Sequence, residues 1–416
     1  MVEDMPAHLT SAGVARVHEA MAARVGKREL PGLVTLLASG DTVHVDPIGA
    51  VALDTDEPMR RDTLFRIASL TKPILAAVTM MFVEDGRIRL DEPVDRLLPE
   101  FADRRVLRRI DGPIDDTVPA DRPISVADLL TLRLGFGQIT EPEFDPPFPI
   151  VREAAALELT LGPPDPRTPH SPDEWMRRFG SLPLMDQPGE RWRYNVGSLV
   201  LGVLVARAGQ GTLGDVLRDH LFTPLGMVDT GFETTADKTR RMPEQYMSDP
   251  ATGQLAMQPL AAAETWTSPP PFPSGSGGLL STIDDFYAFA RMLRNRGRHE
   301  ERQILSEASV EAMTTNHLTA DQISSGGLLL GNQGWGYGMG VVTAPTENGL
   351  TPGQYGWSGG YGTTWFNDPT RDLIAIALTQ TSDFLWNGGL DEFDRLAVEA
   401  VAGDDARVDG RPTTRH

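Results

Sequence analysis

The segment 68–86, ASLTKPILAAVTMMFVEDG, is apolar at nearly every position as far as Phe82. A helix with no polar side has to be buried among other elements, so this segment predicts a helix at the centre of a large core. Pro73 fits only in the first turn of a helix, which places the start of the helix near Ser69. Ser69 then lies at the positive end of the helix dipole, and Lys72 lies on the same face about one turn away.

The pairing of Ser69 with Lys72 favours nucleophilic catalysis. A serine hydroxyl reacts poorly until a nearby group takes its proton, and an amine can take it. The 416 residues include three lysines, Lys27, Lys72 and Lys238, so arginine carries nearly all the positive charge. A serine three residues before a lysine also arises by chance, and the interpretation therefore requires partner groups elsewhere in the chain.

Composition excludes several classes of function. The net charge of −20 disfavours binding to nucleic acid or to an anionic membrane. The absence of cysteine excludes disulfides, thiolate metal sites and a cysteine nucleophile. The chain starts without a basic and apolar leader and has no apolar run long enough for a membrane span, so we expect a cytoplasmic protein. We expect a small molecule as its partner, with no metal and no cofactor.

The order of elements predicts a sheet built from both ends of the chain. Residues 8–26 have the spacing of an amphipathic helix, and the apolar runs 33–40 and 41–53, broken by a Gly-Asp turn, predict a hairpin. From residue 335 onward, short strands alternate with glycine-rich turns, and residues 391–403 predict a closing helix.

A mainly helical region interrupts these sheet elements. Helical patterns at 124–137, 171–182 and 196–209 are separated by proline-rich loops, and a glycine-rich loop then enters a helix capped by Thr282 or Ser281. We expect a single unit rather than two sequential domains. In that unit a mixed sheet-and-helix part comprises 8–75 and 272–403, a mainly helical part comprises 76–271, and 404–416 form a disordered tail.

Two further segments carry candidate chemistry. Tyr194 follows a Pro-Gly turn and precedes an apolar helix. A tyrosine in this setting could be a core residue, a lid aromatic or a catalytic group. The segment YGWSGGYGTTWFNDP has glycines at 356, 359, 360 and 362 among aromatic residues. Glycine on a strand lets a ligand approach the backbone, whose N–H can donate to a developing oxyanion, although a tight hairpin also explains the pattern.

Taken in order, these motifs resemble those of serine β-lactamases and penicillin-binding proteins. The similarity is strongest to the esterases that resemble class C β-lactamases, called family VIII carboxylesterases, and it extends over about residues 30–400. The segments TLFRIASLTK, DEPVDRLLPEF, PLGMVDTGF and SGSGGLLSTIDDFYAFARML also fit that family. The resemblance implies an α/β (α+β) fold, with an antiparallel sheet flanked by helices and an inserted, mostly helical region.

The resemblance also implies a role for each motif. Ser69 would be the acylated nucleophile, with Lys72 and Tyr194 as the base system. The N–H groups of Ser69 and Gly360 would form the oxyanion hole, and a nearby ammonium would lower the pKa of the tyrosine. The residues expected to bind substrate are Trp357, Ser358, Gly359 and Tyr361.

The departures from the family pattern indicate a neutral substrate. β-Lactamases carry Lys-Thr-Gly on the last strand. The triplet that resembles it in this chain is Trp357-Ser358-Gly359, and no lysine follows Lys238. A clamp for a carboxylate is therefore missing. Asn195 directly follows Tyr194, and we expect Val196 to take the place of the family's amide, which weakens turnover of β-lactams.

Residues 356–360 also spell G-x-S-x-G, the nucleophile elbow of α/β-hydrolases. That fold needs a histidine downstream, and the only histidine after Ser358 is His416, at the end of the tail. We therefore do not assign Ser358 as the nucleophile.

The sequence predicts a serine hydrolase that cleaves small neutral esters through an acyl group on Ser69. Three alternatives stay open. In the first, the same acyl-enzyme serves an acyltransferase, or an amidase or D-amino-acid peptidase. The second is a weak β-lactamase, and the third is a non-catalytic binding module.

Overall fold

A computed structural model describes residues 8–140, 146–258 and 263–401. The predicted tail 404–416 lies outside these residues. A seven-stranded antiparallel sheet organises the chain, in the order β11-β12-β13-β14-β15-β1-β2. Its strands are β1 Gly32–Ser39, β2 Thr42–Gly49, β11 Gly334–Trp335, β12 Gly340–Val341, β13 Tyr355–Gly359, β14 Thr363–Asp368 and β15 Leu373–Thr379.

Strands from the two ends of the chain meet inside this sheet. β1 pairs with β15, with Leu36 opposite Ile376, so the first strand lies between its hairpin partner and the last strand. The predicted hairpin of β1 and β2 is confirmed, and Gly40 has φ 56° in the turn. β3 Phe65–Arg66, the extended stretch before Ser69, pairs with β8 Leu280–Ser281 outside the main sheet.

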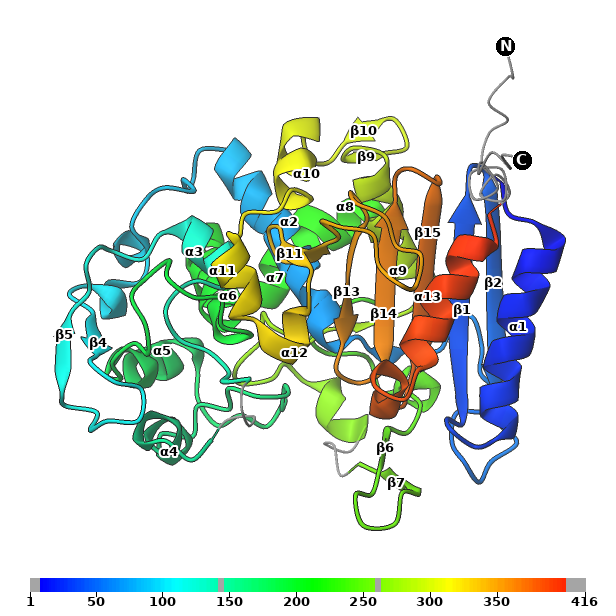
Figure 1. The fold of residues 1–416 in the computed structure, drawn as a ribbon, viewed down its shortest axis with the longest axis horizontal. Coiled ribbons are helices and arrows are strands. Elements are labelled where there is room, and N and C mark those ends of the chain that lie inside the picture. The colour runs from blue at the N-terminus through cyan, green and yellow to red at the C-terminus, as the bar shows by residue number, and fades with distance from the viewer. Residues whose placement is uncertain (1–7, 141–145, 259–262, 402–416) are drawn as a thin grey trace, which may run out of the picture.

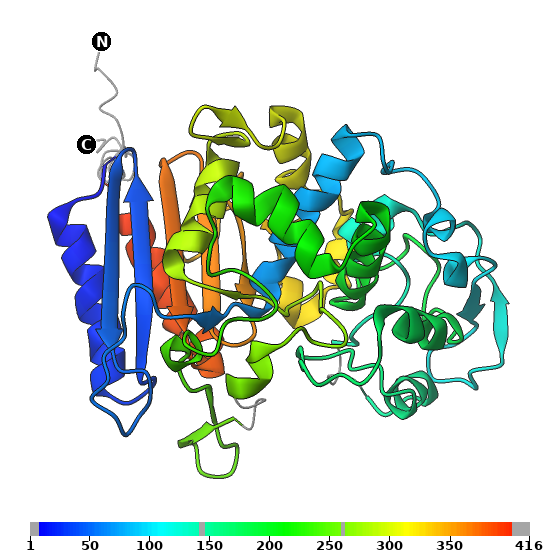
Figure 2. The same ribbon diagram turned by 180° about the vertical axis from the view of Figure 1, so that it is seen from behind.

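Helices cover both faces of the sheet. α1 Ser11–Gly26 and α13 Gly389–Glu399 lie side by side on the face seen in Figure 1, where Val17, Leu37 and Phe393 share an apolar cluster. α9 Ile283–Arg294 covers the opposite face, which Figure 2 shows. Thr282, one of the two caps that the sequence predicts, caps α9.

The remaining helices and short strands belong to the helical part, which lies to one side of the sheet, or to the segments that connect this part with the sheet. The helices are α3 Val126–Leu130, α4 Pro149–Ala156, α5 Pro172–Gly180, α6 Val196–Gly209, α7 Leu213–Leu217, α8 Thr223–Leu225, α10 Glu307–Met313, α11 Ala320–Ser324 and α12 Gly327–Leu330. Short two-stranded pairs are β4 Arg105–Leu107 with β5 Thr117–Pro119, β6 Tyr246–Ser248 with β7 Leu255–Met257, and β9 Arg298–His299 with β10 Arg302–Gln303.

The apolar segment of the sequence forms the central helix. α2 Thr71–Glu84 is buried from Thr71 to Phe82 and packs against the equally apolar α6. The helix begins two residues after Ser69, because Ala68–Leu70 form a 3₁₀ turn, η1, that leads into it. None of the helices in the described parts of the chain is by itself long and apolar enough to cross a bilayer.

Candidate active site

Ser69 lies in a strained turn at the start of α2. Ala68, the residue before it, has φ 46°, a left-handed conformation that is unfavourable for a residue with a Cβ. The hydroxyl of Thr363 on β14 donates a hydrogen bond to the carbonyl of Ile67 at 3.0 Å and holds the turn against the sheet. The turn fixes Ser69 in the wall of a cavity.

Gly359 and Tyr361 support this wall from outside the cavity. A Cβ on Gly359 would lie 2.3 Å from the carbonyl oxygen of Ile67, so only glycine lets the end of β13 pack this closely against the turn. Tyr361 is buried, and its hydroxyl donates to the carbonyl of Pro164 at 3.3 Å. Sequence reasoning expected both residues to bind substrate, whereas the structure places neither in the cavity lining.

Lys72 is buried with its amine beside the Ser69 hydroxyl. Its Nζ lies 3.0 Å from Ser69 Oγ, 2.9 Å from Asn195 Oδ1 and 2.7 Å from the carbonyl oxygen of Ser276. The side chain is 1% exposed, and burial lowers the pKa of Lys72 well below its ordinary value. The free amine, which can accept a proton, is therefore favoured.

Tyr194 is held between the nucleophile and an indole. Its hydroxyl lies near Ser69, which acts to lower its pKa, and accepts a hydrogen bond from Trp357 Nε1 at 2.8 Å. Burial raises the pKa of Tyr194 to about 12. The expected lowering by a nearby ammonium is wrong: Lys72 Nζ lies over the face of the ring, 4.4 Å from its centroid, and desolvation dominates. Tyr194 is thus a phenol that can donate a proton.

Asn195 belongs to the site, which sequence reasoning missed. Its backbone has φ 82° and ψ −57°, and the N–H of Val196 donates to the carbonyl of Tyr194 at 3.2 Å, which closes a γ-turn. The reversal turns the amide of Asn195 toward Lys72, so the expectation that Val196 fills the amide position is wrong. Asn195 Nδ2 also donates to the carbonyl of Leu161 at 2.7 Å. The sequence signal was an asparagine, which tolerates positive φ, directly before a helix.

The cavity beside Ser69 is about 320 Å³ in volume and mainly apolar. A Cβ added at Gly360 would meet no atom within 4 Å, and Gly360 is one of the residues that line the cavity. The residues expected from sequence that line it are Ser69, Tyr194, Trp357, Ser358 and Gly360. Other lining residues include Leu329, Val342, Leu350, Gln354, Phe366, Leu390 and Asp394.

Two exposed apolar side chains form the rim of this cavity. Leu328 on α12 is 72% exposed, and Trp386, between η7 Ser382–Leu385 and α13, is 68% exposed. In Figure 1, α12 and α13 lie on either side of β13 and β14. Exposed apolar side chains around a cavity are typical of a surface that binds an apolar ligand.

Comparison with known proteins decides the family. The model of the family described as Beta-lactamase matches residues 17–399. The chain belongs to the beta-lactamase family. Its relatives confirm the resemblance to family VIII esterases and the expected fold. Protein Rv1367c of Mycobacterium tuberculosis is 36% identical over 362 residues, which cover 84% of this chain and 86% of Rv1367c.

An esterase is among the beta-lactamase-family relatives. Esterase EstB of Burkholderia gladioli is 31% identical over 376 residues, which cover 86% of this chain and 87% of EstB. The solved structure described as EstCE1, a hydrolase with promiscuous acyltransferase activity, superposes with a TM-score of 0.77 at 23% identity, covering 93% of this chain and 98% of EstCE1.

The G-x-S-x-G segment is not a nucleophile elbow in this beta-lactamase-family structure. Ser358 lies within β13, and its hydroxyl is 3.0 Å from the hydroxyl of Thr364 on the neighbouring strand. An elbow requires a sharp turn from a strand into a helix. Ser358 instead lines the cavity from the middle of a strand pair.

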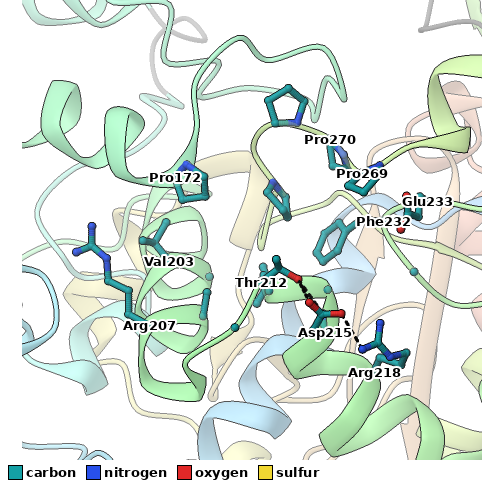
Figure 3. A pocket seen from close by; sticks show the side chains of 18 of the residues that line it. Pro172, Val203, Arg207, Thr212, Asp215, Arg218, Phe232, Glu233, Pro269 and Pro270 are labelled. Carbon is teal, nitrogen blue, oxygen red and sulfur yellow. Dashed lines mark hydrogen bonds and ion pairs between the residues drawn. The ribbon is translucent and has the colours of Figure 1, made fainter.

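A larger cavity, of about 790 Å³, opens between α6, α7 and the proline-rich loop 269–273 (Figure 3). Ser69 is not among its lining residues. Four of its five charged lining residues are in ion pairs, since Arg207 binds Glu100 and Asp173, and Asp215 binds Arg218; the fifth, Glu233, is exposed to solvent. Paired charges at the surface offer no activated group, so the chemistry belongs to the smaller cavity beside Ser69.

Proposed function

We propose that this protein is a carboxylesterase that cleaves neutral esters through an acyl group on Ser69. The observation that carries the proposal is the contact of Ser69 Oγ with the buried amine of Lys72 at 3.0 Å. A neutral amine at this distance can take the proton of the hydroxyl as Oγ attacks a carbonyl carbon.

In the acylation step, Ser69 Oγ bonds to the carbonyl carbon and its proton passes to Lys72. The oxyanion accepts hydrogen bonds from the N–H groups of Ser69 and Gly360. As the tetrahedral intermediate collapses, Tyr194 donates its proton to the leaving alcohol. Lys72 is then an ammonium and Tyr194 a phenolate, and their opposite charges stabilise each other.

In the deacylation step, the phenolate of Tyr194 takes a proton from water, and the hydroxide attacks the acyl carbon. Ser69 Oγ leaves and recovers its proton from Lys72. Both groups return to their neutral forms. These are the forms that burial favours, since burial lowers the pKa of Lys72 and raises that of Tyr194 to about 12.

The composition of the cavity supports a neutral substrate. Its described lining contains no lysine or arginine, and the resemblance to β-lactamases places Trp357 where those enzymes have a lysine. A carboxylated substrate would therefore enter without a cationic partner. Leu328 and Trp386 at the rim offer an apolar surface to the remainder of the ester.

Hydrolysis of p-nitrophenyl esters by matched serine variants tests the proposal. We expect Ser69→Ala to abolish turnover while the variant stays folded, and Ser358→Ala to retain it. An active Ser69→Ala together with an inactive Ser358→Ala would contradict the assignment. Added alcohols distinguish hydrolysis from acyl transfer, because a transferase converts the acyl group to a new ester in preference to the acid.

A further inference from the structure

The active-site cavity contains an acid that the proposed chemistry does not use. Asp394 lies on α13, one helical turn after Leu390, and both residues line the cavity. Asp394 is 8% exposed, and its Oδ1 is buried without a hydrogen-bond partner among the described residues. Burial and the nearby Asp391 raise the pKa of Asp394 well above its ordinary value, which favours the neutral carboxylic acid.

A second polar group without a partner lines the same cavity. Gln354 directly precedes β13 and is 1% exposed. Its Oε1 accepts a hydrogen bond from the N–H of Thr351 at 2.9 Å, which fixes the amide, while its Nε2 is buried without a partner within the described residues. Asp394 and Gln354 thus introduce unsatisfied polar groups into a lining made mostly of leucine, valine and aromatic side chains.

Two unsatisfied polar groups destabilise a fold, since each loses its hydrogen bonds to water and gains none in return. Leucine or methionine at either position would avoid this loss. A cavity that keeps both groups is suited to a ligand that supplies the missing partners, because such a site rejects analogues that lack the matching group.

We propose that Asp394 and Gln354 form a polar subsite for a neutral hydrogen-bonding group, a hydroxyl or an amide, which the ester carries away from its scissile bond. The substrate class is then an amphipathic ester: an apolar body lies against the leucines and aromatic residues of the cavity, and one polar group reaches the subsite. This inference rests on the proposed function, because it assigns specificity within the cavity of Ser69.

A pair of esters matched in chain length tests the subsite. p-Nitrophenyl nonanoate has a plain chain, and p-nitrophenyl 6-acetamidohexanoate carries an amide within it. On the alcohol side, octyl acetate and the monoacetate of octane-1,8-diol form the equivalent pair. We expect the wild type to prefer the polar member of at least one pair in kcat/KM. We expect Asp394→Leu to reduce that preference about tenfold, as the loss of a neutral hydrogen bond to a substrate does. Asp394→Asn, which still donates and accepts, should retain part of it.

Glu399→Gln is the matched control. Glu399 lies on the same helix, is exposed, accepts a hydrogen bond from Arg395 at 2.7 Å and does not line the cavity. Its variant should keep the wild-type preference. Thermal unfolding gives a second readout: Asp394→Leu should melt at the same temperature as the wild type or higher, whereas a structural role for the carboxyl would lower the melting temperature.

Equal rates on both members of both pairs, or an unchanged preference in Asp394→Leu, would overturn the subsite. A preference for an ω-amino ester over both members of a pair would overturn it as well, since a cation would require an ionised Asp394. These results are distinct from failure of the proposed function, in which no ester is turned over through Ser69.

Discussion

Asn195 Oδ1 accepts a hydrogen bond from Lys72 Nζ at 2.9 Å, and a γ-turn with φ 82° turns the amide toward that amine. Asn195 Nδ2 is in turn anchored on the carbonyl of Leu161 at 2.7 Å. The amide is therefore fixed from one side and positions the amine from the other. Asn195 acts on the reaction through Lys72 and is a positioning residue.

Substitutions at Asn195 should change the pH profile as well as the rate. Asn195→Asp places a carboxylate beside Lys72, which raises the pKa of the amine and moves the acid limb of kcat/KM to higher pH. Asn195→Ala removes an acceptor for the ammonium and should move that limb to lower pH, with a loss on the order of 10- to 100-fold in kcat/KM. Identical pH profiles in the wild type and both variants would contradict the positioning role.

The burial of Lys72 predicts a pH-dependent stability. Its pKa is lowered in the folded state, so between that value and the ordinary 10.5 the unfolded chain binds more protons than the folded chain. The free energy of unfolding should therefore rise with pH across this window, by up to about 1.4 kcal/mol per pH unit from this group. Chemical denaturation at a series of pH values measures it. Lys72→Met should lack this contribution, and parallel curves for the two proteins would count against it.

Gly359 should be irreplaceable for steric reasons. In Gly359→Ala the Cβ would lie 2.3 Å from the carbonyl oxygen of Ile67, so the turn before Ser69 must shift. We expect a loss of about 1–3 kcal/mol in the free energy of unfolding, as for other overpacked sites. Gly360→Ala is the matched control for stability, because a Cβ there meets no atom within 4 Å. Equal stabilities for the two variants would refute the steric argument.

The apolar rim should select for the size of the ester. Leu328→Ala and Trp386→Ala remove contacts that a long chain makes and a short chain does not, so KM for p-nitrophenyl decanoate should rise several-fold more than KM for p-nitrophenyl acetate. Val228→Ala is the control, because Val228 is 79% exposed and does not line the cavity. A rim without a role in binding would leave the ratio of the two KM values unchanged.

Local patterns were sufficient to predict the pair of Ser69 and Lys72, because helical spacing depends on neighbouring residues alone. The hairpin, the cap at Thr282 and the joining of both chain ends in one sheet also follow from periodicity and turn residues. The state of Tyr194 could not be predicted, because its pKa depends on burial by residues distant in the sequence. The sequence predicts Gly359 and Tyr361 as substrate contacts. In the structure Gly359 instead packs closely against the Ile67 carbonyl, and Tyr361 donates a hydrogen bond to the Pro164 carbonyl.

Asn195 and Asp394 show two other limits of sequence reasoning. The contact of Asn195 with Lys72 depends on one backbone dihedral angle, and a sequence does not show the sign of φ. Asp394 lies among other acidic residues on an amphipathic helix, and acidic residues on such a helix normally belong to its solvent-exposed face. Only the packing of α13 against the sheet, where the helix contacts β15, brings it into the cavity.

Mass spectrometry of the acyl-enzyme is the most direct test of catalysis through Ser69. The protein is treated with a fluorophosphonate, or quenched during turnover of p-nitrophenyl acetate, and then digested so that the modified peptide can be sequenced. We expect the added group on Ser69, and we expect Lys72→Ala to slow its appearance strongly. A label on Ser358 or on any other residue, with Ser69 unmodified, would contradict the mechanism.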